Sequence, residues 1–166
     1  MKYALVKRIG CAALFLAALV INPLPSLAQN SMAFGFDITL SPKAAQTLAA
    51  SGEGITIGAS FYGVPNKRGE KHANEIGNID LGYEQIDMPG EESAVRVTGR
   101  TIDAKMLDYI DGPAMVNVNV YSSRKASEDN ILSCDLIDGQ VQTLQAQAIT
   151  VHCGLIEENL PLQTKP

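Results

Sequence analysis

The feature that most constrains this chain is an alternation of apolar and polar residues with a period of two. The clearest case is Val116, Val118 and Val120, with Asn117 and Asn119 between them. Because successive side chains of a strand point to opposite faces, such a stretch predicts a strand with one buried face. Seven such strands are expected, and their inward residues are Phe34, Phe36, Ile38 and Leu40; Ile55, Ile57, Ala59 and Phe61; Ile79, Leu81 and Tyr83; Val95 and Val97; Val116, Val118 and Val120; Leu132, Cys134 and Leu136; and Ile149, Val151, Cys153 and Leu155.

The third of these stretches contains a change of parity. Its inward positions run to Tyr83, after which Ile86 and Met88 continue the apolar series on the other parity. A strand that keeps one buried face through such a slip needs an extra residue. A bulge or bend is therefore predicted near Glu84 and Gln85.

Two short helices are predicted between the strands. The first begins at Ser41 as N-cap, has a proline at its first helical position and ends near Gly52. The second begins at Asp103 as N-cap, with Ile102 and Leu107 placed to form a hydrophobic staple. Both are about two turns long and need to pack on the sheets to be stable.

These elements predict an all-β fold, an antiparallel β-sandwich of about seven strands with two short helices. A transthyretin-like or immunoglobulin-like layout is expected, and a small barrel is the alternative. Residues 29–166 are expected to form a single domain, because no linker or internal repeat divides them. The last part of this domain, 157–166, is expected to be a loose tail.

Residues 1–28 have the layout of a signal peptide. A positively charged start precedes an apolar run from Cys11 to Ile21, and small residues precede a predicted cleavage site between Ala28 and Gln29. The run is shorter than the roughly 20 residues that a helix needs to cross a bilayer. We therefore expect a periplasmic or secreted protein with no stable membrane anchor; an uncleaved anchor or a lipoprotein is the alternative.

Loss of the signal peptide makes the chain more acidic. Three of its 13 basic residues lie in 1–28 and all 18 acidic residues follow, which leaves 10 basic residues and a net charge of −8. Nucleic acids and anionic lipids attract basic surfaces. Nucleic acid is therefore not expected as a partner, and binding to an anionic lipid surface is not expected either.

The two cysteines of the mature chain, Cys134 and Cys153, are predicted to form a disulfide, since an even pair in an exported protein is usually oxidised. A redox or metal pair would normally be spaced more closely. If the two strands are antiparallel neighbours with the cysteines opposite each other, the same register brings two further apolar pairs together: Leu132 with Leu155, and Leu136 with Val151.

The candidate binding residues lie in a polar loop and on one strand. In the loop, Lys67, Arg68 and Lys71 are suited to bind an anionic group, with His72 close by; a solvated connection without a ligand is the alternative. A second mixed-charge loop, 122–130, forms a shared surface with the first only if both lie at the same end of the sandwich.

On the strand, Asn117 and Asn119 point outward, and Asn is depleted in strands. They indicate either hydrogen bonding between side chains across the sheet or a polar contact surface.

No motif for nucleophilic catalysis, phosphate binding or metal binding is present in the sequence, and no cofactor or metal is expected. The sequence therefore favours a non-catalytic exported protein that binds a protein or small-molecule partner through loops or an edge strand. Two alternatives are an inhibitor or protective protein directed at an envelope enzyme, and a hydrolase that uses a carboxylate pair.

Overall fold

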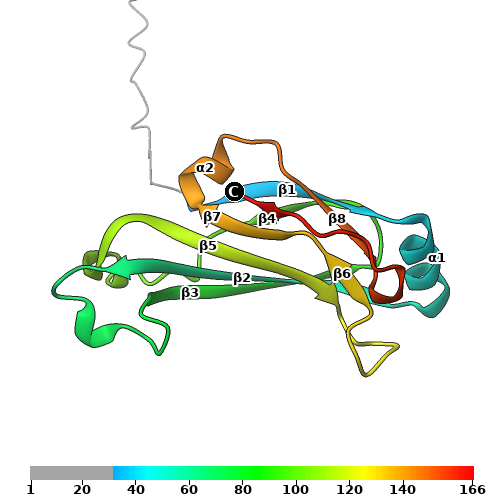
Figure 1. The fold of residues 1–166 in the computed structure, drawn as a ribbon, viewed down its shortest axis with the longest axis horizontal. Coiled ribbons are helices and arrows are strands. Elements are labelled where there is room, and N and C mark those ends of the chain that lie inside the picture. The colour runs from blue at the N-terminus through cyan, green and yellow to red at the C-terminus, as the bar shows by residue number, and fades with distance from the viewer. Residues whose placement is uncertain (1–31) are drawn as a thin grey trace, which may run out of the picture.

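The structure, a computed structural model, describes residues 32–166. The predicted signal peptide, 1–28, and its cleavage site lie outside the described residues. Within them, nine strands form two sheets that pack on each other as a sandwich (Figure 1). The four-stranded sheet has the order β4 (Ser93–Val97), β1 (Phe34–Leu40), β8 (Thr150–Leu155) and β6 (Leu132–Cys134). The five-stranded sheet has the order β3 (Ile79–Pro89), β2 (Gly54–Pro65), β5 (Ile110–Ser122), β7 (Leu136–Gln140) and β9 (Thr164–Lys165).

The core between the sheets is aliphatic and matches the predicted inward faces closely. Ile57, Val118 and Val151 have no exposed surface, and nearly all the predicted inward residues are buried with them. The main exception is Tyr83, whose side chain is 51% exposed. Burial of these alternating faces is the principal force that holds the two sheets together.

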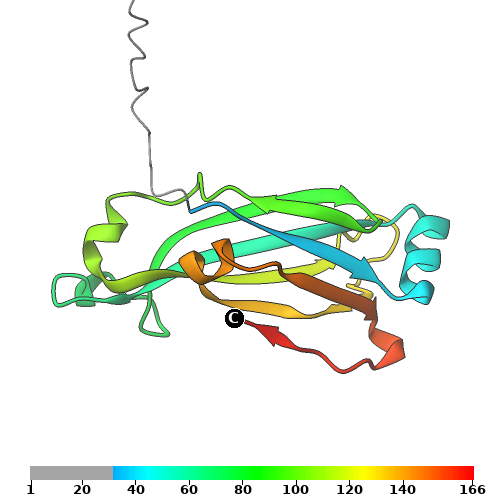
Figure 2. The ribbon, with the colours of Figure 1, turned by 90° about the horizontal axis from the view of Figure 1, so that it is seen from above.

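Both sheets are mixed, so the prediction of a purely antiparallel sandwich is wrong. β1 pairs antiparallel with β4 but parallel with β8, and β7 pairs parallel with β9. The parallel pair of β1 and β8 joins strands that are more than 100 residues apart in the chain (Figure 2). Alternation reveals which face of a strand is buried but not the direction of its neighbour, which is why the sequence did not reveal these pairs.

The helices differ in part from those predicted. The first, α1 (Pro42–Ser51), is confirmed: Ser41 Oγ accepts a hydrogen bond from Ala44 N at 3.0 Å, and Gly52 ends the helix with a left-handed φ of 70°. The second is only a 3₁₀ turn, η2 (Met106–Tyr109), and the Asp103 carboxylate accepts a hydrogen bond from Lys105 N just before it. A helix that was not predicted, α2 (Val141–Gln145), follows β7 and buries two apolar residues against the sheets, Val141 and Leu144.

The bulge in β3 lies earlier than predicted. The pairing with β2 shifts where Phe61 and Tyr62 face Gly82 and Asp80, so Leu81 is the extra residue. Parity therefore changes before Tyr83, which turns outward. Glu84 turns inward as a result.

The buried carboxylate of Glu84 accepts hydrogen bonds from Thr98 N and Oγ1 and from Gly99 N, at 2.9–3.1 Å. These bonds satisfy a charged side chain on the buried face and link β3 to the segment that follows β4.

The predicted sixth strand divides at Asp135 into β6 in one sheet and β7 in the other. The antiparallel register of β6 and β8 places Leu132 opposite Leu155 and Cys134 opposite Cys153, as predicted. Beyond that point Leu136 pairs with Thr164 of β9, so the predicted pairing of Leu136 with Val151 is wrong.

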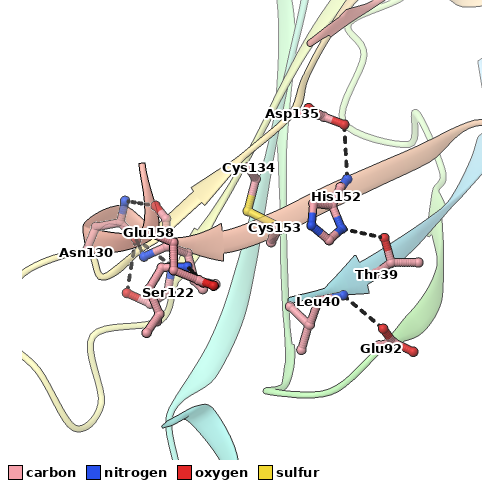
Figure 3. The surroundings of a disulfide bond; sticks show 12 residues. Thr39, Leu40, Glu92, Ser122, Asn130, Cys134, Asp135, His152, Cys153 and Glu158 are labelled. Carbon is pink, nitrogen blue, oxygen red and sulfur yellow. Dashed lines mark hydrogen bonds between the residues drawn. A yellow bond between two sulfur atoms is a disulfide. The ribbon is translucent and has the colours of Figure 1, made fainter. Parts of the chain in front are cut away.

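A disulfide joins Cys134 and Cys153, with a Cα–Cα distance of 4.0 Å (Figure 3). Cys153 is fully buried, whereas Cys134 is partly exposed. The bond fastens β6 to β8 one residue before the chain crosses to the other sheet.

The C-terminal residues, expected to be loose, attach to the five-stranded sheet through Asp135. The Asp135 carboxylate accepts from His152 N at 3.2 Å and from Gln163 N at 2.8 Å, and lies 3.3 Å from Lys165 Nζ. Burial raises the pKa of Asp135, but the backbone donors and Lys165 outweigh burial and hold its pKa below the usual value. The buried carboxylate thus secures both the strand crossing and the tail. A further 3₁₀ turn, η3 (Ile156–Glu158), leads into this segment.

Candidate binding surfaces

The outer face of the five-stranded sheet carries polar and aromatic side chains in rows across neighbouring strands. In one row Tyr83, Ser60, Asn117 and Asp138 face one another on β3, β2, β5 and β7. Cross-strand neighbours have Cβ atoms about 5 Å apart, so these four side chains form one continuous band. Adjacent rows add Asp80 and Tyr62 on one side, and Asp87, Thr56 and Tyr121 further along. We call this the tyrosine face.

The tyrosine side chains extend across this face. Tyr62 donates from its hydroxyl to Asp138 Oδ1 at 2.7 Å, which carries the side chain from β2 over β5 to β7. Tyr83 extends over Gly58, where a Cβ atom would lie 2.5 Å from its hydroxyl oxygen. Gly58 is therefore needed for this close approach, which brings Tyr83 towards Tyr121; burial and the nearby Tyr83 hydroxyl raise the pKa of Tyr121. The hydrogen bond to Asp138 and the packing over Gly58 hold these two rings in place.

A pocket of about 600 Å³ lies at one end of the tyrosine face. Its lining includes Tyr62, Tyr83, Asn117, Asp80 and Asp138, and we call it the outer-face pocket. Residues of the loop between β2 and β3 form its rim, among them Ile76, whose side chain is 81% exposed. Of this set, only Asn117 was predicted from the sequence as a binding residue. The outward parity of Tyr62 beside Phe61 was the signal that could have found a second member.

Burial and a hydrogen bond within the pocket make Tyr62 a weaker acid than a free phenol. Burial and the hydrogen bond to Asp138 raise the pKa of Tyr62 to about 12, so the phenol stays protonated at neutral pH. On the other wall, Asn74 Nδ2 donates to Asp80 Oδ1 at 2.7 Å. Each carboxylate therefore has one oxygen engaged by a neutral donor of the protein, which orients the group.

Asn117 and Asn119 lie on the tyrosine face, as their outward parity predicted. Asn119 Nδ2 donates to Asn117 Oδ1 at 3.1 Å. This bond runs along β5, between positions i and i+2, and not across the sheet. Asn117 lines the outer-face pocket, while Asn119 lies one row away from it.

The predicted loop residues form a second surface. Lys67, Arg68 and Lys71 line one hollow of about 520 Å³ together with Glu70 and Tyr109, and we call this the basic loop. The loop contains the 3₁₀ turn η1 (Glu70–His72), and the His72 ring packs on the ring of Tyr109 at 4.6 Å. The structure thus brings together the three cationic residues and His72, but not Asn117 or Asn119.

The basic loop has a defined conformation. Asn66 Oδ1 accepts from Arg68 N and Gly69 N, both at 3.0 Å, and Asn66 Nδ2 donates to the carbonyl groups of Asp108 and Ile110. Arg68 Nη2 also donates to the Asp108 carbonyl at 3.0 Å. Part of the donor capacity of Arg68 is therefore used within the fold.

The second polar loop, 122–130, lies at the other end of the sandwich. β2 and β5 are antiparallel, with Pro65 opposite Ile110 and Ile55 opposite Ser122. The basic loop follows Pro65 and the second loop follows Ser122, so the two loops extend from opposite ends of β2, as Figure 1 shows. The condition for a surface shared by both loops is therefore not met.

The polar residues around the disulfide have structural partners. Ser41 Oγ donates to Glu158 Oε2 at 2.6 Å. His152 Nδ1 lies 3.1 Å from Thr39 Oγ1, as Figure 3 shows. Ser41 is buried at the start of α1, where its oxygen also caps the helix. Ser41 is therefore a helix cap, and His152 and Thr39 are a hydrogen-bonded pair on the surface.

Neither a membrane-spanning helix nor a metal-binding cluster is found among the described residues, 32–166. No helix among them has the length and apolarity needed to cross a membrane. Nor do they contain a cluster of three or more His, Cys, Asp or Glu side chains arranged to hold a metal ion.

Comparisons with known proteins found no match among protein-family models, curated proteins or solved structures. The choice between the tyrosine face and the basic loop therefore rests on their chemistry and geometry.

Proposed function

We propose that this chain is a non-catalytic, exported binding protein that recognises a partner protein through its tyrosine face. The observation that carries the proposal is the outer-face pocket, in which Tyr62, Tyr83, Asn117 and two carboxylates meet on a rigid sheet. Tyrosine supplies a large contact area at a low cost in conformational entropy, and asparagine and serine supply adaptable hydrogen bonds. Antibody binding loops are enriched in these side chains for that reason, and tyrosine is enriched at protein interfaces in general.

The tyrosine face is favoured over the basic loop because its side chains are already ordered. A hydrogen bond holds Tyr62 on Asp138 and Tyr83 packs closely over Gly58, so little further ordering is needed on binding. The lysines of the basic loop are exposed, and immobilising such long side chains reduces the gain from each contact. Export is supported by the disulfide between Cys134 and Cys153 and by the layout of residues 1–28.

Site-specific photo-crosslinking in the native cell tests the proposal. A photoreactive phenylalanine would replace Tyr83 on the tyrosine face, Lys71 in the basic loop, or Asp37 on the outward side of β1 as a matched control. Discrete adducts with one protein are expected from position 83 and none from position 37. Adducts from position 71 alone would refute the tyrosine face as the binding surface.

The identity of the adduct would also distinguish the alternatives. An envelope enzyme that loses activity or gains protection on binding would specify an inhibitory or protective role. Turnover of a glycoside by the isolated protein, lost when Asp138 is replaced by asparagine, would contradict the non-catalytic proposal and favour a carboxylate hydrolase.

A further inference from the structure

The outer-face pocket has an excess of hydrogen-bond acceptors. Asp80 and Asp138 both line it, and no lysine, arginine or histidine is among its lining residues. The hydroxyl hydrogen of Tyr62 is used in the hydrogen bond to Asp138. The Tyr62 oxygen can therefore only accept a hydrogen bond from a ligand. A ligand that fits these groups is rich in donors and positively charged.

The aromatic rings favour the same kind of ligand. Tyr83 is 51% exposed and extends over Gly58, and Tyr62 spans the neighbouring strand to reach Asp138. A cation placed over a tyrosine ring is attracted by the negative charge density on the face of the ring. Guanidinium groups also stack flat on such rings while donating at their edges.

The charges elsewhere on the tyrosine face do not offset the two carboxylates of the pocket. The positive charge of Lys125 favours the ionised form of Asp87, and that of Arg124 favours the ionised form of Tyr121. Asp87 and Tyr121 lie in a row that is four residues along the strands from Tyr83. The chain after the predicted cleavage site has a net charge of −8, which would attract a basic partner over long distances.

We propose that the outer-face pocket binds an arginine or lysine side chain presented by the partner protein, with Asp80 and Asp138 as its ionic partners and Tyr62 and Tyr83 as its aromatic walls. This inference rests on the proposed function and specifies the chemistry of the partner segment. Arginine is favoured over lysine, because its planar donors can engage a carboxylate and stack on a ring together.

Titration with defined peptides tests this proposal. The probe is a fluorescent heptapeptide in which two arginines are separated by serines. The matched peptides carry lysine, citrulline or glutamate in place of arginine; citrulline keeps the shape and the urea donors but has no charge. Binding is followed by fluorescence anisotropy, and the ring signals of Tyr62 and Tyr83 by NMR. Protein variants are Asp80→Asn and Asp138→Asn, with Asp37→Asn as a control that removes one exposed charge from the opposite face.

The arginine peptide is expected to bind and to shift the signals of both rings, and the citrulline and glutamate peptides to bind at least about tenfold more weakly. Each pocket variant should weaken arginine binding by about fivefold or more, while Asp37→Asn changes it by less than about twofold. Raising the salt concentration from about 50 to about 300 mM should also weaken binding.

Three results would overturn the proposal: equal binding of the citrulline and arginine peptides, pocket variants that behave like Asp37→Asn, or no binding of either basic peptide at millimolar concentration. In each case a crosslinked partner at position 83 would still support the tyrosine face as a binding surface. Failure of the cation proposal and failure of the proposed function are therefore distinguishable.

Discussion

Glu53 is the residue whose replacement most directly tests how the fold holds its second polar loop. Its side chain is 3% exposed, and its carboxylate accepts backbone hydrogen bonds from Gly54, Lys125, Ala126 and Ser127 at 2.8–3.3 Å. Three of these donors belong to the loop between β5 and β6, so one carboxylate joins the start of β2 to a segment about 70 residues away.

Replacing Glu53 with glutamine keeps its size but removes its charge and turns one of its two acceptor atoms into a donor. Charged hydrogen bonds contribute about 1.5–3 kcal/mol each, and a buried donor left without a partner costs about 1–3 kcal/mol. Because bonds to one group are not additive, we expect a loss of about 3 kcal/mol in the free energy of unfolding, or roughly 12 °C in melting temperature. Urea unfolding monitored by circular dichroism measures it.

The pH dependence provides a second readout. Burial raises the pKa of Glu53, but the four backbone donors outweigh it and hold the pKa below 4.5. Since the pKa is lower in the folded than in the unfolded state, its stabilisation is complete above about pH 4.5 and is lost as the pH falls through the folded pKa. The difference in free energy of unfolding between wild type and Glu53→Gln should therefore become smaller in acid.

The matched control for Glu53→Gln is Glu128→Gln, an exposed acid in the same loop, which should change stability by less than about 0.5 kcal/mol. Equal stability of the two variants at pH 7 would refute the account of Glu53.

Three further predictions concern the disulfide, the tail and the tyrosine face. Replacing Cys134 and Cys153 with alanine should lower the free energy of unfolding by about 3 kcal/mol, from the loop entropy for a separation of 19 residues; unchanged urea unfolding would contradict this. Asp135→Ala should destabilise the protein by about 3 kcal/mol and make the bonds after Asn159 more susceptible to limited proteolysis, whereas a tail as resistant as in wild type would show that other contacts hold it. In an alkaline titration followed by ultraviolet absorbance, one tyrosine should ionise near pH 12, and this step should disappear in Tyr62→Phe; a step that persists in the variant would assign it to another residue.

The faces of the strands could be predicted from the sequence because burial imposes a period of two. The register of β6 and β8 could also be predicted, since the disulfide and the pairing of Leu132 with Leu155 require the same alignment. β9 could not be predicted, because its two residues are too few to show a period and its partners, the backbone of β7 and the Asp135 carboxylate, lie 28 residues earlier in the chain. The bulge lies at Leu81 but was predicted near Glu84, because Tyr83 is apolar enough to resemble a core residue in the sequence.

The candidate site could be predicted only in part, because the outer-face pocket is built from four strands. Asn117 was identified by its unusual place on a strand, but Asp80 and Asp138 are ordinary outward residues in the sequence. Only the pairing of Tyr62 with Asp80 across strands, and its hydrogen bond to Asp138, brings them together. The buried carboxylates Glu53 and Glu84 were missed for the same reason, since their partners lie in segments distant in sequence or beyond a turn.

The most direct measurement of the central claim is an NMR map of the isotopically labelled protein with the partner that crosslinks at position 83. The account predicts that the amide signals that shift lie on the outward rows of β2, β3, β5 and β7 around Tyr62 and Asp138. Shifts confined to the basic loop around Lys71, or to the outward side of β1, would contradict it.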